Sequence, residues 1–147
     1  MPAVSLKQAN AIISAALAEG RKRGLKPLTV AVLDPGGHLV ALQREDGSGI
    51  LRVEIASGKA YGALGMGFGS RELAERARTS APFIAAVAAA SGGRMVPAAG
   101  GVLILDRPGG DVQGAVGISG DISDEDEACA LAGIAAAGLI GVTGLRD

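Results

Sequence analysis

The sequence predicts an α+β fold with one antiparallel sheet, built from two hairpins and flanked by helices. Two turns carry this prediction, because each contains Pro and two Gly residues and lies between short apolar segments. The turn at 34–37 joins segments 28–33 and 39–43, and the turn at 106–110 joins segments 102–105 and 112–118. Helical patterns precede, separate and follow the hairpins, so the element order is α-β-β-α-α-β-β-α. Strands that come in antiparallel pairs exclude the alternating Rossmann arrangement.

The first helix is expected at residues 5–23. Ser5 and Gln8 form a capping-box pattern, and apolar residues then recur at helical spacing. In the turn that follows, Pro35 at the second position and Gly36 at the third predict a type II turn.

Four further helices are expected in the rest of the chain, three of them with a polar residue at the start that can cap the helix. They are a helix at 50–66, a short helix capped by Ser70 and ending near Arg78, a helix at 82–90 capped by Thr79 or Ser80, and a final Ala-rich helix capped by Ser123 or Asp124.

Composition and charge narrow the class of protein. The 147 residues fit one domain, 1–147, with a single core. A net charge of -1 and the lack of basic clusters argue against a nucleic-acid partner. Apolar segments fall short of the ~20 residues of a membrane span, and residues 1–20 do not resemble a secretion leader. We therefore expect no membrane association and a cytoplasmic location. Cys129, the single cysteine, is expected in the core, and no metal site is predicted.

Small residues dominate the apolar part of the sequence. The chain has 24 glycines but one tyrosine, two phenylalanines and no tryptophan. Such a composition leaves flat apolar surfaces that commonly pack against partner subunits. We expect a homo-oligomer.

The main candidate site is the Ser119-Gly120 turn, which joins a strand to the N-terminus of the last helix. Unpaired backbone N–H groups and the helix dipole at such an end favour an anion. Arg94, which precedes the Gly100-Gly101 stretch, is a candidate clamp, because a guanidinium binds a carboxylate through two hydrogen bonds. The alternative for Arg94 is an exposed arginine that follows a helix end.

Three side chains are candidate acids or bases: Lys59, Glu54 and Asp126. Burial of Lys59 against apolar surface would lower its pKa and let it bind a carboxylate or act as a base. The alternative is a lysine whose stem covers apolar surface while its ammonium reaches water. The acidic cluster at 121–127 lacks the spacing of a calcium loop. It caps the last helix, contributes Asp126 to the site, or does both.

His38 is the single histidine and follows the first turn. A neutral imidazole is a common ligand of heme iron and of other metals, so His38 is a candidate heme contact. A surface position in the hairpin is the alternative, because heme crevices are lined by large apolar side chains that this composition scarcely supplies.

Several motifs occur in order along nearly the whole chain: 31–40 (AVLDPGGHLV), 44–47 (REDG), 56–60 (ASGKA), and 114–120 (GAVGISG) followed by 124–127 (DEDE) and 132–133 (AG). In these motifs the sequence resembles the GlcG/HbpS family of small heme-degrading-type domains, which is similar to the C-terminal domain of some cobalamin adenosyltransferase proteins. The resemblance implies a profilin-like α/β/α sandwich that assembles into oligomers, with an acidic site residue at Asp126. It implies heme binding or degradation for some members and glycolate, diol, small-acid or aromatic metabolism for others.

Two functions are consistent with these features. The first is a binding protein that holds a small anionic ligand, with heme as a candidate through its propionates, in a pocket formed by Ser119-Gly120, Arg94 and Lys59. The second is an isomerase, hydratase/lyase or hydrolase without a redox cofactor, in which Arg94 clamps a small carboxylic acid and one of the three acid-base candidates moves a proton. A purely structural oligomer is a third possibility. We place the binding protein first.

Overall fold

Ten helices and strands make up the structure, a computed structural model that describes residues 3–146. In chain order they are α1 (Leu6–Lys22), β1 (Thr29–Leu33), β2 (Leu39–Arg44), α2 (Arg52–Met66), α3 (Ser70–Thr79), α4 (Ala81–Ala90), β3 (Gly101–Leu105), β4 (Val112–Ser119), α5 (Ser123–Ala136) and β5 (Ile140–Val142).

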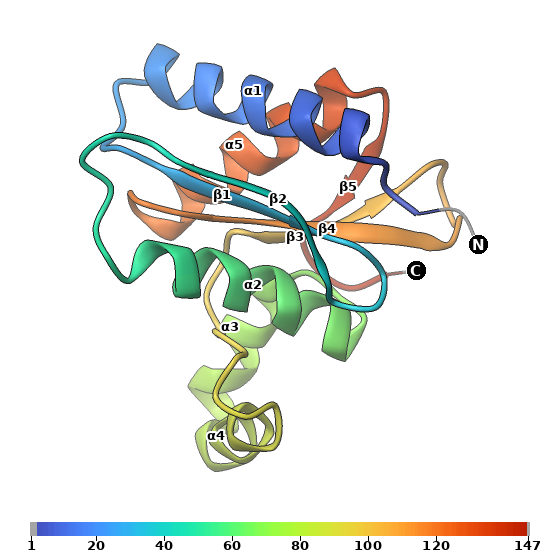
Figure 1. Ribbon diagram of the computed structural model, residues 1–147. Helices are drawn as coiled ribbons and strands as arrows, with labels where there is room; N and C mark the ends of the chain where they lie inside the picture. The colour runs from blue at the N-terminus through green and yellow to red at the C-terminus, as the bar shows by residue number, and fades with distance from the viewer. Residues whose placement is uncertain (1–2, 147) are drawn as a thin grey trace.

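A single antiparallel sheet with the strand order β2-β1-β4-β3-β5 forms the middle layer. Helices α1 and α5 cover one face, and α2 covers the other (Figure 1). Helices α3 and α4 lie on the α2 side, and α4 is far from the sheet (Figure 1). The predicted α+β class, with helices on both faces of one antiparallel sheet, is confirmed. Within residues 3–146, no helix has both the length and the apolar character needed to cross a membrane.

The sheet has one strand more than the sequence predicted. Strand β5 pairs with β3, with Leu103 opposite Val142 and Leu105 opposite Ile140. This strand has three residues with a glycine in the middle, so it carries neither the alternation nor the length by which strands are recognised.

The two faces of the sheet pack differently. Against α1 and α5, branched side chains such as Ile12, Val32 and Ile118 form a fully buried core. Helix α2 lies close to the other face, where an added Cβ on Gly117 of β4 would overlap the carbonyl oxygen of Ala56. Glycine in the sheet therefore allows α2, which carries most of the candidate site, to lie close to the strands.

The first hairpin turn is not the predicted type II turn. Gly37, and not Gly36, has a positive φ, of 82°. The Gly37 N–H donates to the carbonyl of Asp34 at 2.9 Å, and the Asp34 N–H donates to the carbonyl of His38 at 2.9 Å. This is a type I turn followed by a glycine bulge. The Asp34 carboxylate accepts from the N–H groups of Gly36 and His38, which stabilises that conformation.

Of the predicted caps, only the capping box of Ser5 and Gln8 is confirmed. Ser70 is buried inside α3, where its hydroxyl donates to the carbonyl of Ala98 and accepts from the N–H of Gly101. At the N-termini of α3, α4 and α5, no side chain forms a capping hydrogen bond. The N-cap residues of these helices are Gly69, Ser80 and Ile122. Ser80 therefore occupies the N-cap position predicted for α4, but its side chain makes no capping hydrogen bond. The side chains of Ser70 and Asp124 do not cap because they make tertiary contacts, with the Ala98 carbonyl and with Arg71.

Candidate functional site

The residues predicted to form one pocket lie in two separate places. Lys59 and Asp126 meet beside the Gly100-Gly101 and Ser119-Gly120 segments, where β3 and β4 border α2 and α5. Glu54 and Arg94 line a different cavity, on the exposed side of α2. His38 contributes to neither group.

Lys59 and Asp126 form a buried ion pair. The Lys59 ammonium donates to the carboxylate of Asp126 at 3.2 Å and to the carbonyl of Ile118 at 2.9 Å. Their side chains are 3% and 0% exposed. Burial lowers the pKa of Lys59 and raises the pKa of Asp126, and each charge partly opposes the effect of burial on the other. The second carboxylate oxygen of Asp126 accepts from the N–H of Asp121 at 3.0 Å.

Neighbouring groups complete this buried network. The Lys59 side chain lies against Gly100, whose φ is 123° and where an added Cβ would be 3.0 Å from the lysine ammonium. The Ser119 hydroxyl is fully buried and accepts from the guanidinium of Arg52 at 2.9 Å. We expected an open pocket at the Ser119-Gly120 turn, but the protein's own side chains fill that space. The network therefore joins α2, β4 and α5.

The acidic cluster at the start of α5 forms ion pairs with α1 and α3. The Arg71 guanidinium of α3 binds both carboxylate oxygens of Glu127, at 2.9 to 3.1 Å, and contacts Asp124. Glu125 pairs with Arg23 of α1 at 3.0 Å. In the part of the chain that the structure describes, no three His, Cys, Asp or Glu side chains gather as metal ligands would. Cys129 is buried, and burial raises its pKa to about 11, so its thiol is an inert core group.

A second candidate site is a cavity of about 370 Å³, which we call the Tyr61 cavity. Three of its lining residues are polar or charged, three are aliphatic, one is aromatic and three are glycines. They are Glu54, Ser57, Arg94, Leu33, Leu39, Val53, Tyr61, Gly37, Gly58 and Gly93. An apolar wall with a few convergent polar groups is the usual composition of a ligand pocket.

Helix spacing and glycine contacts build this cavity. Glu54, Ser57 and Tyr61 are spaced three and four residues apart, so they lie on one face of α2. After α4, the backbone reverses through Gly92 and Gly93, with φ of 74° and 78°. The returning segment packs on Gly58, where an added Cβ would overlap the carbonyl oxygen of Arg94. This contact places Arg94 beside α2.

Arg94 stacks on the single tyrosine of the chain. Its guanidinium carbon is 3.6 Å from the centroid of the Tyr61 ring, which is a cation–π contact. An added Cβ on Gly37 would be 2.9 Å from the same ring, so the hairpin turn also supports it. Neither Arg94 nor Glu54 forms an ion pair with another residue between 3 and 146. The Tyr61 cavity thus presents one positive and one negative group that form no ion pair within the described residues.

His38 lies outside the Tyr61 cavity. Its side chain is 81% exposed, and its Nδ1 is 3.2 Å from the Asp34 carboxylate. Its neighbours Gly37 and Leu39 line the cavity. The geometry agrees with the surface alternative considered for His38.

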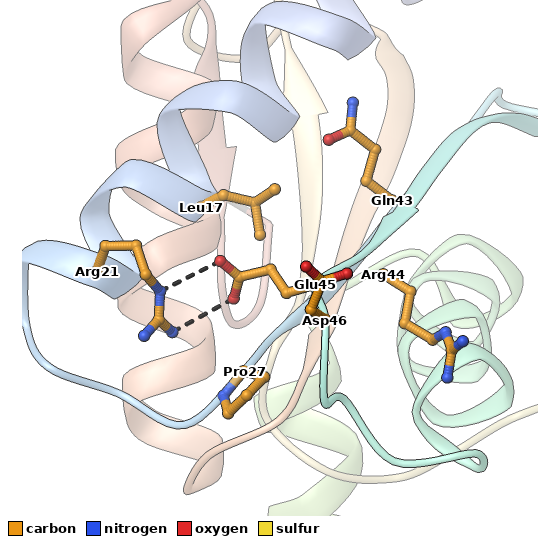
Figure 2. Close-up of a pocket in the computed structure, with 7 residues that line it drawn as sticks. All are labelled: Leu17, Arg21, Pro27, Gln43, Arg44, Glu45 and Asp46. Atoms are coloured by element: carbon orange, nitrogen blue, oxygen red, sulfur yellow. Dashed lines mark hydrogen bonds and ion pairs between the residues drawn. The ribbon is translucent and has the colours of Figure 1, made fainter.

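A cavity on the other face of the sheet is less suited to an anion. It has a volume of about 400 Å³ and lies between the end of α1 and the residues that follow β2 (Figure 2). Its Arg21 already pairs with Glu45 at 3.1 Å, and this pair crosses the cavity in Figure 2. Arg21 also donates to the carbonyl of Lys26. A second arginine, Arg44, donates to the carbonyl of Ser48, and the carboxylates of Glu45 and Asp46 also line this cavity. The two carboxylates make the cavity less favourable for an anion than the Tyr61 cavity.

Most residues that line the Tyr61 cavity were missed by sequence reasoning, among them Tyr61, Leu39 and Val53. Tyr61 could have been found, because it shares a helix face with Glu54 and is the only tyrosine. Leu39 and Val53 belong to different elements, and only the fold shows that they face one cavity.

The fold and these sites define a small antiparallel α+β sandwich with an amphipathic cavity beside α2. The family model with the description "Haem degrading protein HbpS-like" matches residues 4–135, so the chain belongs to this family.

Solved structures agree with this assignment. HbpS of Streptomyces reticuli, in a double-mutant form, is 28% identical with a TM-score of 0.76, over 92% of this chain and 87% of that chain. A PduOC:heme complex is 24% identical with a TM-score of 0.81, over 93% and 96%. The Klebsiella pneumoniae protein ORFY is 20% identical with a TM-score of 0.82, over 93% and 92%. The latter two likenesses concern the fold alone. No curated protein matches the sequence.

Proposed function

We propose that this protein binds a small anionic ligand in the Tyr61 cavity, with Arg94 as the group that binds the negative charge. The observation that carries the proposal is the Arg94 guanidinium, which stacks on Tyr61 and has no carboxylate partner among residues 3–146. Stacking holds the guanidinium plane while its N–H groups stay free for two hydrogen bonds to a carboxylate. Leu33, Leu39 and Val53 offer apolar contacts to the body of the ligand.

Heme is the first candidate ligand, because the family is described as heme-degrading and one similar fold is a heme complex. Arg94 fits a propionate group. The cavity, at about 370 Å³, is at the low end of the range for drug-sized ligands, so it does not enclose a porphyrin ring. Leu39, which is 59% exposed, would offer an apolar contact to the part of the heme outside the cavity. The imidazole of His38, next to Leu39, or the phenol of Tyr61 would bind the iron.

A hemin titration followed by visible absorption tests this proposal. We expect a saturable Soret shift whose affinity falls about tenfold in Arg94→Gln, because one charge-assisted contact is lost. Arg78→Gln, an exposed arginine on α3, is the matched control and should bind as the wild type does. Loss of the shift in His38→Ala would identify the imidazole as the axial ligand, whereas its survival would favour Tyr61.

If no saturable shift is seen, heme is excluded and the second candidate function, an enzyme acting on a small carboxylic acid, comes first. The carboxylate of Glu54, which lines the same cavity as Arg94, supports this alternative because it can act as a base. Lys59 and Asp126 are less suited to that role, since they are buried and paired with each other. Exchange of solvent deuterium into a bound acid, lost in Glu54→Gln, would identify this activity.

A further inference from the structure

We infer that the ligand of the Tyr61 cavity is a zwitterion, with a carboxylate and an ammonium group separated by an aliphatic chain. The inference rests on the anion site of the proposed function, because it assigns the carboxylate to Arg94, and it places a small zwitterion there instead of heme. It adds a second recognition element, Glu54, and it names a chemical class, the ω-amino carboxylic acids.

Two opposite charges line the cavity without pairing. Among the described lining residues, Arg94 is the one cation and Glu54 is the one carboxylate, and they do not form an ion pair with each other. Elsewhere on the surface, opposite charges that lie close together form ion pairs, as Arg76 does with Glu72 and Arg23 with Glu19. Two separated and unpaired charges in one cavity are complementary to a ligand with two charged ends.

The geometry of α2 separates the two ends. Glu54 and Tyr61 are seven residues apart on one helix face, which corresponds to about 10 Å along the axis at ~1.5 Å per residue. Arg94 lies over the Tyr61 ring, and its backbone carbonyl lies against Gly58, four residues after Glu54. A ligand with methylene groups between its charges can contact both side chains without bringing them together.

The surface between the two charges suits such a chain. The aliphatic residues Leu33, Leu39 and Val53 line the same cavity and can contact methylene groups. Ser57, between Glu54 and Tyr61 on the helix, is the one hydroxyl group besides the tyrosine among the lining residues. By contrast, a dicarboxylic ligand of the same length would bring a second negative charge to Glu54, which is unfavourable.

The test uses isothermal titration calorimetry with two probes of equal length, ε-aminocaproate and caproate. We expect ε-aminocaproate to bind the wild type about five- to tenfold more tightly, as expected for one charge-assisted contact at a partly exposed site. Glu54→Gln should remove this preference, so that the two probes bind with similar affinity. Arg94→Gln should weaken both probes. The shorter β-alanine should bind less tightly than ε-aminocaproate.

Controls and outcomes separate the inference from the proposed function. Glu75→Gln, an exposed carboxylate on α3, should leave both affinities unchanged, and a thermal melt checks the fold of each variant. Equal binding of the two probes to the wild type, or a preference that persists in Glu54→Gln, overturns the zwitterion and leaves the anion site intact. If neither probe binds, the inference fails, and the hemin titration decides the proposed function on its own. If Arg94→Gln has no effect on a bound probe, the anion site and the inference fail together.

Discussion

Lys59 shows how burial decides between a functional and a structural use of a charged residue. Its ammonium lies between the carbonyl of Ile118 and the carboxylate of Asp126, and neither side chain reaches water to any useful extent. A buried ion pair of this kind contributes little net stability compared with an apolar pair, but removal of one partner leaves an uncompensated charge. We therefore interpret the pair as a structural contact between α2 and α5.

This interpretation predicts the stability of single and double variants. Lys59→Met should lower the free energy of unfolding by about 3–5 kcal/mol, because Asp126 stays buried without its cation. The double variant Lys59→Met, Asp126→Asn should recover most of this loss, since the neutral amide still accepts from the N–H of Asp121. Urea denaturation with a fixed m-value measures both. Lys7→Met, at an exposed position, is the control and should change the free energy of unfolding little. If Lys59→Met lowered the free energy of unfolding as little as Lys7→Met does, the interpretation as a buried ion pair would be contradicted.

At the scale of elements, α2 positions the cavity because its glycines allow other segments to approach it. Gly58 contacts the segment that returns from α4, and its carbonyl accepts from the N–H of Val96 at 3.1 Å. Gly65, in the same helix, has no atom within 4 Å of an added Cβ. Gly58 and Gly65 are both glycines of α2 and differ in whether another segment packs against them. They therefore form a matched pair for substitution.

Gly58→Ala should displace the segment at Arg94 and lower the free energy of unfolding by about 1–3 kcal/mol through overpacking. Gly65→Ala should be neutral or stabilising by about 0.5–1 kcal/mol, because alanine favours the helix. Tyr61 is the only tyrosine and the chain has no tryptophan, so its fluorescence reports directly on the stacked arginine. A change in this fluorescence for Gly58→Ala, but not for Gly65→Ala, is the expected result. Identical behaviour of the two variants would show that Gly58 does not position Arg94.

At the scale of the whole molecule, the sequence predicted the features that depend on residues close together in the chain. Both hairpins follow from their Pro-Gly-Gly turns, and the first helix follows from Ser5 and Gln8. The site was predicted only in part, because its contacts join distant segments. Lys59 meets Asp126 across 67 positions, and Arg94 reaches Tyr61 only because the chain reverses after α4. Candidate residues could be named from their chemistry, but their grouping required the fold.

Helix α4 presents an apolar surface that is relevant to the association of copies of this protein. It has no charged residue, Ile84 is its one buried residue, and Phe83 is 57% exposed. The helix lies far from the sheet, on the outer side of α3 (Figure 1). An uncharged helix with this much apolar surface in water favours association with a second apolar surface. We propose that the homo-oligomer expected from the composition forms through α4.

Light scattering after gel filtration measures this association. We expect the wild type to be oligomeric and Phe83→Glu to shift it toward the monomer, because a charge would have to be buried in the contact. Leu6→Glu, at a residue with 59% exposure on α1, is the matched control and should not change the mass. A monomeric wild type would contradict the proposal, and so would an oligomer that Phe83→Glu leaves intact. Because α4 leads directly into Arg94, we also expect dissociation to weaken anion binding in the Tyr61 cavity.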